Sequence, residues 1–212
     1  LNIVERGDSI QSIKDLAGKK VYATGQGATP EYTLRHILKE NGIDPDSGLT
    51  IQWCADTTEA LSYIANDSEA IAMLPQPFAT AAMGQVDGLR VAIDLNDAWT
   101  EIEDCDIVTG VVVARSDFVK EHPQAVETFL SEYEASVAYT NDNAADAAEL
   151  IAGYGIVAKA PLAEKAIPKC HITFLKGQEM KDSVSGYLQI LFDENPQAVG
   201  GTLPADDFYY GL

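Results

Sequence analysis

The stretch KKVYATGQGATPE, residues 19–31, joins an apolar strand to the start of a helix and decides the fold class. Residues 19–24 have the composition of a buried strand, and a glycine-rich loop follows them. Thr29 can cap the next helix, Pro30 suits its first position, and Glu31 favours the positive end of the helix dipole. We therefore expect a strand, a tight loop and a helix in this order.

The same alternation continues along the chain. Strands are predicted at residues 49–54 and 70–74, and a helix capped by Asp56 or Thr57 lies between them. The order strand, helix, strand, helix, strand predicts a parallel sheet covered by helices on both faces.

The pattern changes in the second half of the chain. Further strands are predicted at residues 89–95 and 107–114, and mostly helices follow, with one more strand predicted around Cys170 and His171. The chain thus divides into an α/β region at about residues 18–108 and a helix-rich region beyond it. Gly110 lies in the middle of the strand at 107–114, which we predict to be a hinge, because a few backbone rotations there would swing whole lobes.

Composition limits the partners of the protein. The 212 residues include 14 Lys and Arg against 33 Asp and Glu, which gives a formal net charge of -19. Such a chain is repelled by nucleic acid and by anionic lipid surfaces, so we predict no nucleic-acid partner. No stretch approaches the roughly 18 consecutive apolar residues that cross a bilayer.

Residues that carry catalysis or hold metals are sparse. The cysteines, with no CxxC pair, are predicted to be small buried hydrophobic residues, with a single disulfide left open. The histidines form no set with a nucleophile, and His36 is predicted to lie on the polar side of its helix. The acidic residues 101–106 lack a calcium-loop pattern. We predict no catalytic residue, no metal and no cofactor. The residues concerned are Cys54, Cys105, Cys170, His36, His122 and His171.

Ligand contacts are predicted where the parallel strands end. Ligands of open parallel sheets collect at the carboxyl ends of the strands, and three strand-to-helix loops share that edge. The glycine-rich loop offers backbone N–H groups to a polar or anionic group, although Pro30 breaks a dinucleotide-binding pattern. Gln76, held between two prolines, offers both a donor and an acceptor. The glycines serve equally well in a tight turn, and the glutamine as a solvated turn residue. The predicted contacts on these loops are Gly25, Gln26, Gly27, Ala28, Thr29, Asp56 and Gln76.

Four stretches resemble one class of protein. They are IKDLAGKKV at residues 13–21, GATPEY at 27–32, AIAMLPQPF at 70–78 and VVARSDFVKEHP at 112–123. In this order they resemble the substrate-binding proteins of ABC importers for nitrate, sulfonates, taurine and thiamine pyrimidines. The resemblance covers nearly the whole chain and implies the type II periplasmic-binding-protein fold, an α/β fold of two lobes joined by hinge strands.

The resemblance also implies a domain organisation. Residues 1–16 would form the crossover from the first lobe, 17–108 a complete second lobe, and 109–212 the returning hinge strand with the C-terminal half of the first lobe. The first lobe is therefore expected to be incomplete, without its N-terminal part. Thr109 and Gly110 would lie at the floor of the cleft and contact the ligand.

The function implied is capture of a small anionic or heterocyclic molecule. The protein would act outside the cytoplasm, in the periplasm or lipid-anchored as a lipoprotein, as a monomer that delivers its solute to an ABC permease. The enzymes of this class carry a cysteine-rich iron-binding segment that the sequence lacks, so we predict a binding protein that is not an enzyme. Two alternatives stay open: the effector-binding domain of a LysR-type transcription regulator, and an enzyme on the same fold.

Overall fold

The computed structural model describes residues 1–211 and divides them into two compact units. The sheet unit consists of residues 1–108 together with the segment from residue 176 onward, and the helical unit consists of Thr109–Leu175. No helix in the described part of the chain is long and apolar enough to cross a membrane. The predicted assignment of residues to the lobes of a binding protein stays a prediction.

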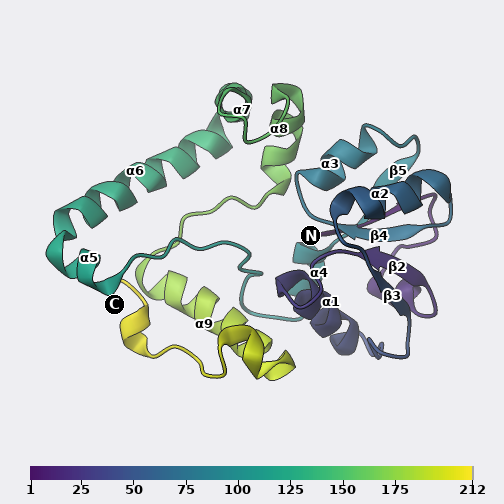
Figure 1. The fold of residues 1–212 in the computed structure, drawn as a ribbon, viewed down its shortest axis with the longest axis horizontal. Helices are drawn as coiled ribbons and strands as arrows, with labels where there is room; N and C mark the ends of the chain where they lie inside the picture. The colour runs from purple at the N-terminus through teal and green to yellow at the C-terminus, as the bar shows by residue number, and fades with distance from the viewer. Residues whose placement is uncertain (212) are drawn as a thin grey trace. The chain divides into compact units, whose positions relative to one another are not determined.

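A five-stranded sheet forms the centre of the sheet unit (Figure 1). Its strands run in the order β3-β2-β4-β1-β5. β2 pairs in parallel with β3 and with β4, as predicted, whereas β1 runs antiparallel to both β4 and β5. The strands are β1 (Asn2–Arg6), β2 (Lys20–Ala23), β3 (Thr50–Trp53), β4 (Ile71–Leu74) and β5 (Leu89–Asp94).

Helices cover both faces of this sheet (Figure 1). Leu34 and Ile37 of α1 join the buried cluster of one face, to which Trp99 of α4 and Tyr187 of α9 also belong. Ile64 of α2 joins the cluster of the opposite face, together with residues of α3. The helices of this unit are α1 (Thr29–Glu40), α2 (Thr57–Asn66), α3 (Phe78–Met83), α4 (Leu95–Thr100) and α9 (Gly177–Glu194), with short 3-10 turns at η1 (Ile13–Leu16), η3 (Pro196–Val199) and η4 (Asp206–Phe208).

The C-terminal helix α9 is fixed to the sheet unit by its buried Tyr187. The Tyr187 hydroxyl lies 2.8 Å from Thr33 Oγ1 of α1. The Tyr187 ring packs edge-on against the ring of Trp99, with 5.4 Å between the ring centroids. Burial raises the pKa of Tyr187 to about 12, against the opposing effect of hydrogen bonds from Thr33 and Thr29. The tyrosine therefore stays protonated and links two helices that are far apart in sequence.

The helical unit buries little. Its core comprises Ala147, Ala148, Ala163 and Ile167, with a few half-buried neighbours. Its elements are α5 (Ser116–Glu121), α6 (Pro123–Asp142), α7 (Ala144–Gly153), α8 (Ala160–Ala166) and η2 (Ile167–Lys169). Ten large apolar or aromatic side chains are exposed in it, namely Val111, Val112, Val113, Phe118, Phe129, Tyr133, Tyr139, Leu150, Tyr154 and Ile156.

Two predicted strands are wrong. Residues 107–114 form no strand, and Val111, Val112 and Val113 are 61%, 56% and 73% exposed. The segment around Cys170 and His171 forms none either. An apolar run becomes a strand only beside another strand, and every strand pair in the part of the chain that the structure describes lies within the sheet of β1–β5.

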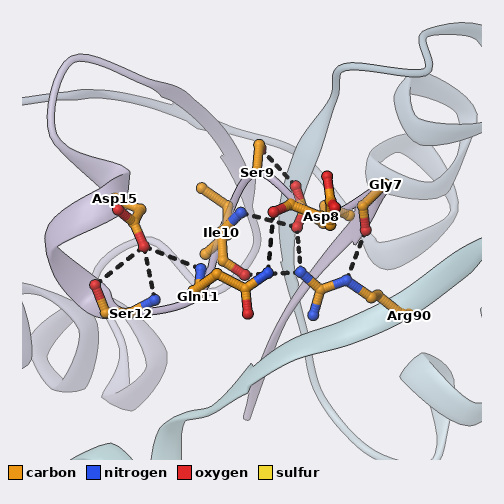
Figure 2. Close-up of polar contacts among 9 residues, drawn as sticks. Gly7, Asp8, Ser9, Ile10, Gln11, Ser12, Asp15 and Arg90 are labelled. Atoms are coloured by element: carbon orange, nitrogen blue, oxygen red, sulfur yellow. Dashed lines mark hydrogen bonds and ion pairs between the residues drawn. The ribbon is translucent and has the colours of Figure 1, made fainter.

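A buried ion pair anchors β1 (Figure 2). The side chain of Glu5 is 3% exposed, and one of its carboxylate oxygens lies 2.6 Å from Arg90 Nη2 on β5. The carboxylate also accepts hydrogen bonds from Ser9 Oγ at 2.6 Å and from the Ile10 N–H at 2.9 Å. Burial acts to raise the pKa of Glu5, but these hydrogen bonds and the charge of Arg90 together lower it below its ordinary value.

We expect Arg90→Met to lower the free energy of unfolding by about 2 kcal/mol at neutral pH, because it leaves the buried Glu5 carboxylate without its counter-charge. Because the pKa of Glu5 is lowered by folding, the charged pair stabilises the fold above the ordinary glutamate range, and this contribution is lost as the pH falls through the folded-state pKa. Urea unfolding should show the difference between wild type and variant narrowing in acid.

The matched control for this experiment is Arg35→Met. Arg35 pairs with Asp46 at 2.9 Å, but that carboxylate is 73% exposed, so the change should cost well under about 1 kcal/mol. Equal losses of stability in the two variants would contradict the stabilising role of the buried pair.

We expect Tyr187→Phe to cost about 1–2 kcal/mol, because it leaves the buried Thr33 hydroxyl without its Tyr187 partner. The double variant Tyr187→Phe, Thr33→Val should recover part of that loss, since it removes both polar groups. Thermal unfolding measures both, with Tyr154→Phe at an 80% exposed position as the neutral control. Strict additivity of the two single changes would argue against the link.

Candidate ligand-binding edge of the sheet

The carboxyl ends of β3, β2 and β4 lie side by side at one edge of the sheet. The connection that leaves β2 passes to the face covered by α1, whereas those that leave β3 and β4 pass to the face covered by α2 and α3. Open α/β sheets bind ligands where connections diverge in this way. The structure thus brings Gly25–Thr29, Asp56 and Gln76 to a common edge.

The loop between β2 and α1 is shaped by its glycines. Gly25 and Gly27 have φ angles of +86° and +74°. A Cβ at Gly25 would lie 2.7 Å from Cγ of Pro30, so the loop lies directly against the first turn of the helix. Gln26, Gly27 and Ala28 are exposed, whereas Gly25 and Thr29 are half-buried.

The start of α1 differs from the prediction. Ala28, and not Thr29, is the N-cap residue, and it supplies no side-chain hydrogen bond; Pro30 is the second helical residue. The hydroxyl of Thr29 instead belongs to the contacts of Tyr187. The Gly27 N–H donates to Glu31 Oε2 at 2.6 Å, so a carboxylate from the first turn takes the place that a side-chain cap would fill.

Asp56, one of the two predicted caps, is the N-cap of α2. Its Oδ1 accepts hydrogen bonds from the Thr58 N–H at 2.8 Å and from the Glu59 N–H at 2.9 Å. Glu59 completes the arrangement by accepting the Ala55 N–H at 2.7 Å through its Oε2. One carboxylate oxygen of Asp56 is therefore committed to its own helix.

Gln76 has a fixed amide with one free donor. Its Oε1 lies 2.8 Å from Thr80 Oγ1 and accepts the Thr80 N–H at 3.3 Å. Of the two ends of a side-chain amide, only the oxygen accepts an N–H, so this contact also distinguishes the oxygen of Gln76 from its nitrogen. Its Nε2 is buried and has no hydrogen-bond partner within the described chain. A buried donor of this kind costs about 1–3 kcal/mol unless something binds it.

Asn2 is a polar residue at this edge that the sequence pattern did not reveal. It is 2% exposed, and its Nδ2 approaches the Leu74 carbonyl oxygen at 3.5 Å. It pairs with Leu74 of β4 and with Asp94 of β5, at the edge where β4 and β5 end. A prediction of β1 as a strand between β4 and β5 would have placed Asn2 at this edge.

Thr109 and Gly110 belong to the helical unit, where both are exposed. Their predicted role at the floor of a cleft stays a prediction. Other residues line two grooves of the helical unit. One groove lies between α5 and α6 around Pro123 and Phe129, and the other lies between α6 and α7 around Tyr139 and Leu150.

The remaining candidates are explained by packing. His36 was predicted on the polar side of its helix; it is half-buried, and its Nε2 lies 2.7 Å from Glu103 Oε1. The three cysteines are free thiols, of which Cys54 is buried and Cys105 and Cys170 half-buried. Burial raises the pKa of all three thiols. In residues 1–211, no group of three or more His, Cys, Asp and Glu is placed to hold a metal ion.

Solved structures share this fold. An ABC transporter from Parabacteroides distasonis is 24% identical, with a TM-score of 0.72 over 99% of this chain and 70% of that one. The periplasmic aliphatic sulphonate binding protein SsuA from Escherichia coli is 18% identical, with a TM-score of 0.78 over 99% of this chain and 68% of that one. The desulfurization enzyme DSZB is 11% identical, with a TM-score of 0.58 over 91% and 68%.

These likenesses confirm the predicted type II periplasmic-binding-protein fold, and each of the three matched chains is longer than this one. A search of the curated proteins finds no match to the sequence. The family model described as NMT1/THI5 like matches residues 2–147, more than half of the 212 residues. The chain therefore belongs to the NMT1/THI5-like family.

Proposed function

We propose that this protein is the extracytoplasmic solute-binding component of an ABC importer, and that it holds a small molecule at the carboxyl edge of the sheet. The observation that carries the proposal is the buried Nε2 of Gln76, a donor with no partner in the described chain at the place where this fold binds ligands. Family membership supports it, as do the ABC transporter and the sulphonate binding protein that share the fold.

In this mechanism the edge contributes fixed contacts to one side of the solute. Gln76 donates through Nε2, while Thr80 holds its Oε1 and so keeps the amide oriented before the solute arrives. The loop at Gly25–Thr29 lies beside it and offers backbone atoms without side-chain obstruction. Binding energy that favours a closed arrangement of the lobes would then make the loaded protein recognisable to a membrane permease.

The chemistry of the edge supports binding without catalysis. Cys54 follows β3 at this edge and is the residue there with nucleophilic potential. Burial raises the pKa of its thiol, and the charges of Glu59 and Asp56 raise it further. The thiol is therefore protonated at neutral pH and is a poor nucleophile, which supports a binding role in spite of the fold shared with DSZB.

Location and partners follow from the same proposal. An importer component works outside the cytoplasm and delivers its solute to a permease, and the proposal extends to a monomeric protein, free in that compartment or anchored by lipid. The net charge of -19 supports a protein that does not bind nucleic acid, in contrast to the transcription-regulator alternative.

We expect small solutes to raise the melting temperature of the protein, since a ligand that binds only the folded state stabilises it by mass action. The screen should contain sulfonates, carboxylates, their amides and nitrogen heterocycles, and each shift should be checked by titration calorimetry. The proposed function would be refuted by a folded protein that binds none of these classes in either assay.

Gly25→Ala should weaken solute binding at least about tenfold, because the left-handed backbone and the contact with Pro30 both oppose a side chain there. Gly27→Ala is the matched control, with a similar φ but no atom within 4 Å of its Cβ, and should have the smaller effect. Calorimetry on both folded variants measures the difference. If Gly27→Ala weakened binding as much as Gly25→Ala, the contact with Pro30 would not matter.

A further inference from the structure

The carboxyl edge of the sheet carries negative charge and no positive side chain in its connections. The connections 24–31, 54–59, 75–80 and 95–99 contain no Lys or Arg. They and the last residue of β5 contain the carboxylates Glu31, Asp56, Glu59, Asp94 and Asp97.

The basic residues of this part of the chain lie elsewhere. Those next to the sheet have their backbone where β2 and β5 begin and where the antiparallel β1 ends, which is the opposite edge, and two more lie in the later turns of α1. They are Arg6, Lys14, Lys19, Lys20 and Arg90 for the first group and Arg35 and Lys39 for the second. The ammonium of Lys20 reaches back from the start of β2 over the ring of Tyr22, 4.8 Å from its centroid. An anion at the carboxyl edge would therefore meet more negative than positive charge.

Several of the backbone donors that could otherwise hold an anion are already taken. At the start of α1 the Gly27 N–H is bound by Glu31, and at the start of α2 two N–H groups are bound by Asp56 and one, at Ala55, by Glu59. A helix start attracts anions because its N–H groups and dipole are unsatisfied. Here the protein supplies its own carboxylates to some of these groups, so that attraction is reduced.

Gln76 supplies a buried side-chain donor at this edge that has no partner in the described chain. Its Oε1 is held by Thr80, so the amide cannot turn to offer its oxygen, and the buried Nε2 is the atom left over. A free donor is satisfied by an acceptor such as a carbonyl oxygen or a ring nitrogen. Neither atom needs a net negative charge on the solute.

We propose that the edge selects an uncharged or cationic solute that presents a hydrogen-bond acceptor to Gln76 Nε2, and that it rejects anions of the same shape. This inference rests on the proposed function and narrows the predicted class of ligand, which included anions. It sets this chain apart from the aliphatic sulphonate binding protein whose fold it shares.

The test compares matched pairs of solutes that differ only in replacement of an anionic oxygen by an amide nitrogen. The pairs are benzoate and benzamide, nicotinate and nicotinamide, and ethanesulfonate and ethanesulfonamide, titrated by calorimetry at neutral pH and physiological ionic strength, alongside the tightest solutes of the wider screen. We expect the amide of a pair that binds to be at least about tenfold tighter than the acid, and the tightest solute of the screen to carry no net negative charge.

The outcomes separate this inference from the proposed function. An acid that binds as tightly as its amide, or an anion as the tightest solute of the screen, overturns the inference and leaves the proposed function standing. A folded protein that binds no solute at all overturns the proposed function and the inference with it.

Variants test the assigned residues. Gln76→Leu should weaken the amide of a binding pair at least about tenfold, because Nε2 is lost. Glu31→Gln should lower the ratio of amide affinity to acid affinity, because it removes a like charge beside the site. A merely structural role would weaken the binding of both members alike. Glu69→Gln, an exposed acid that lies between α2 and β4 and therefore at the opposite edge, is the control that should leave the ratio unchanged. An unchanged affinity for the amide in Gln76→Leu, or an unchanged ratio of affinities in Glu31→Gln, overturns the assignment.

Discussion

The pairing of β1 between β4 and β5 is the constraint on which the sheet unit depends. Without β1, the strand β5 would have no neighbour in the sheet, and β4 would present an open edge. Ile3 and Val4 are fully buried on opposite faces of the sheet, so this one strand contributes to both cores. The buried Glu5 then fixes its register through Arg90, because a slip of one residue would carry the carboxylate into an apolar face.

The order of strands that β1 completes also creates the candidate site. It places β2 between β3 and β4. The connection that leaves β2 therefore passes to one face of the sheet, and those that leave its two neighbours pass to the other face. Three carboxylates accept hydrogen bonds from backbone N–H groups at the helix starts of that edge. The buried Nε2 of Gln76 has no partner in the described chain. The specificity of the site follows from what the protein has already satisfied internally as much as from the groups that it leaves free.

Several elements could be predicted from sequence because local signals determine them. The strands at β2, β3 and β4 are short apolar runs between turn residues. Asp56 caps its helix through its own side chain, which accepts hydrogen bonds from N–H groups of the first turn. β1 was missed because Asn2 and Glu5 look like surface residues, and their burial depends on partners as distant as Arg90. The strand expected at 107–114 failed for the converse reason, since an apolar run gives no information about whether a neighbouring strand exists. In the site, the sequence singled out Gln76 by its prolines, but only the fold shows that Thr80 occupies one end of its amide and that the other is free.

The distribution of tryptophan gives the sheet unit two natural optical probes. Trp53 is the last residue of β3 and lies half-buried at the candidate edge, whereas Trp99 is fully buried beside Tyr187, with its Nε1 donating to the Cys105 carbonyl oxygen at 2.6 Å. These are the only tryptophans in the sequence, and one meets solvent while the other does not. Emission from the unlabelled protein therefore has a red-shifted component that senses the edge and a blue-shifted component that senses the attachment of α9, so one spectrum separates events at the site from loosening of the fold.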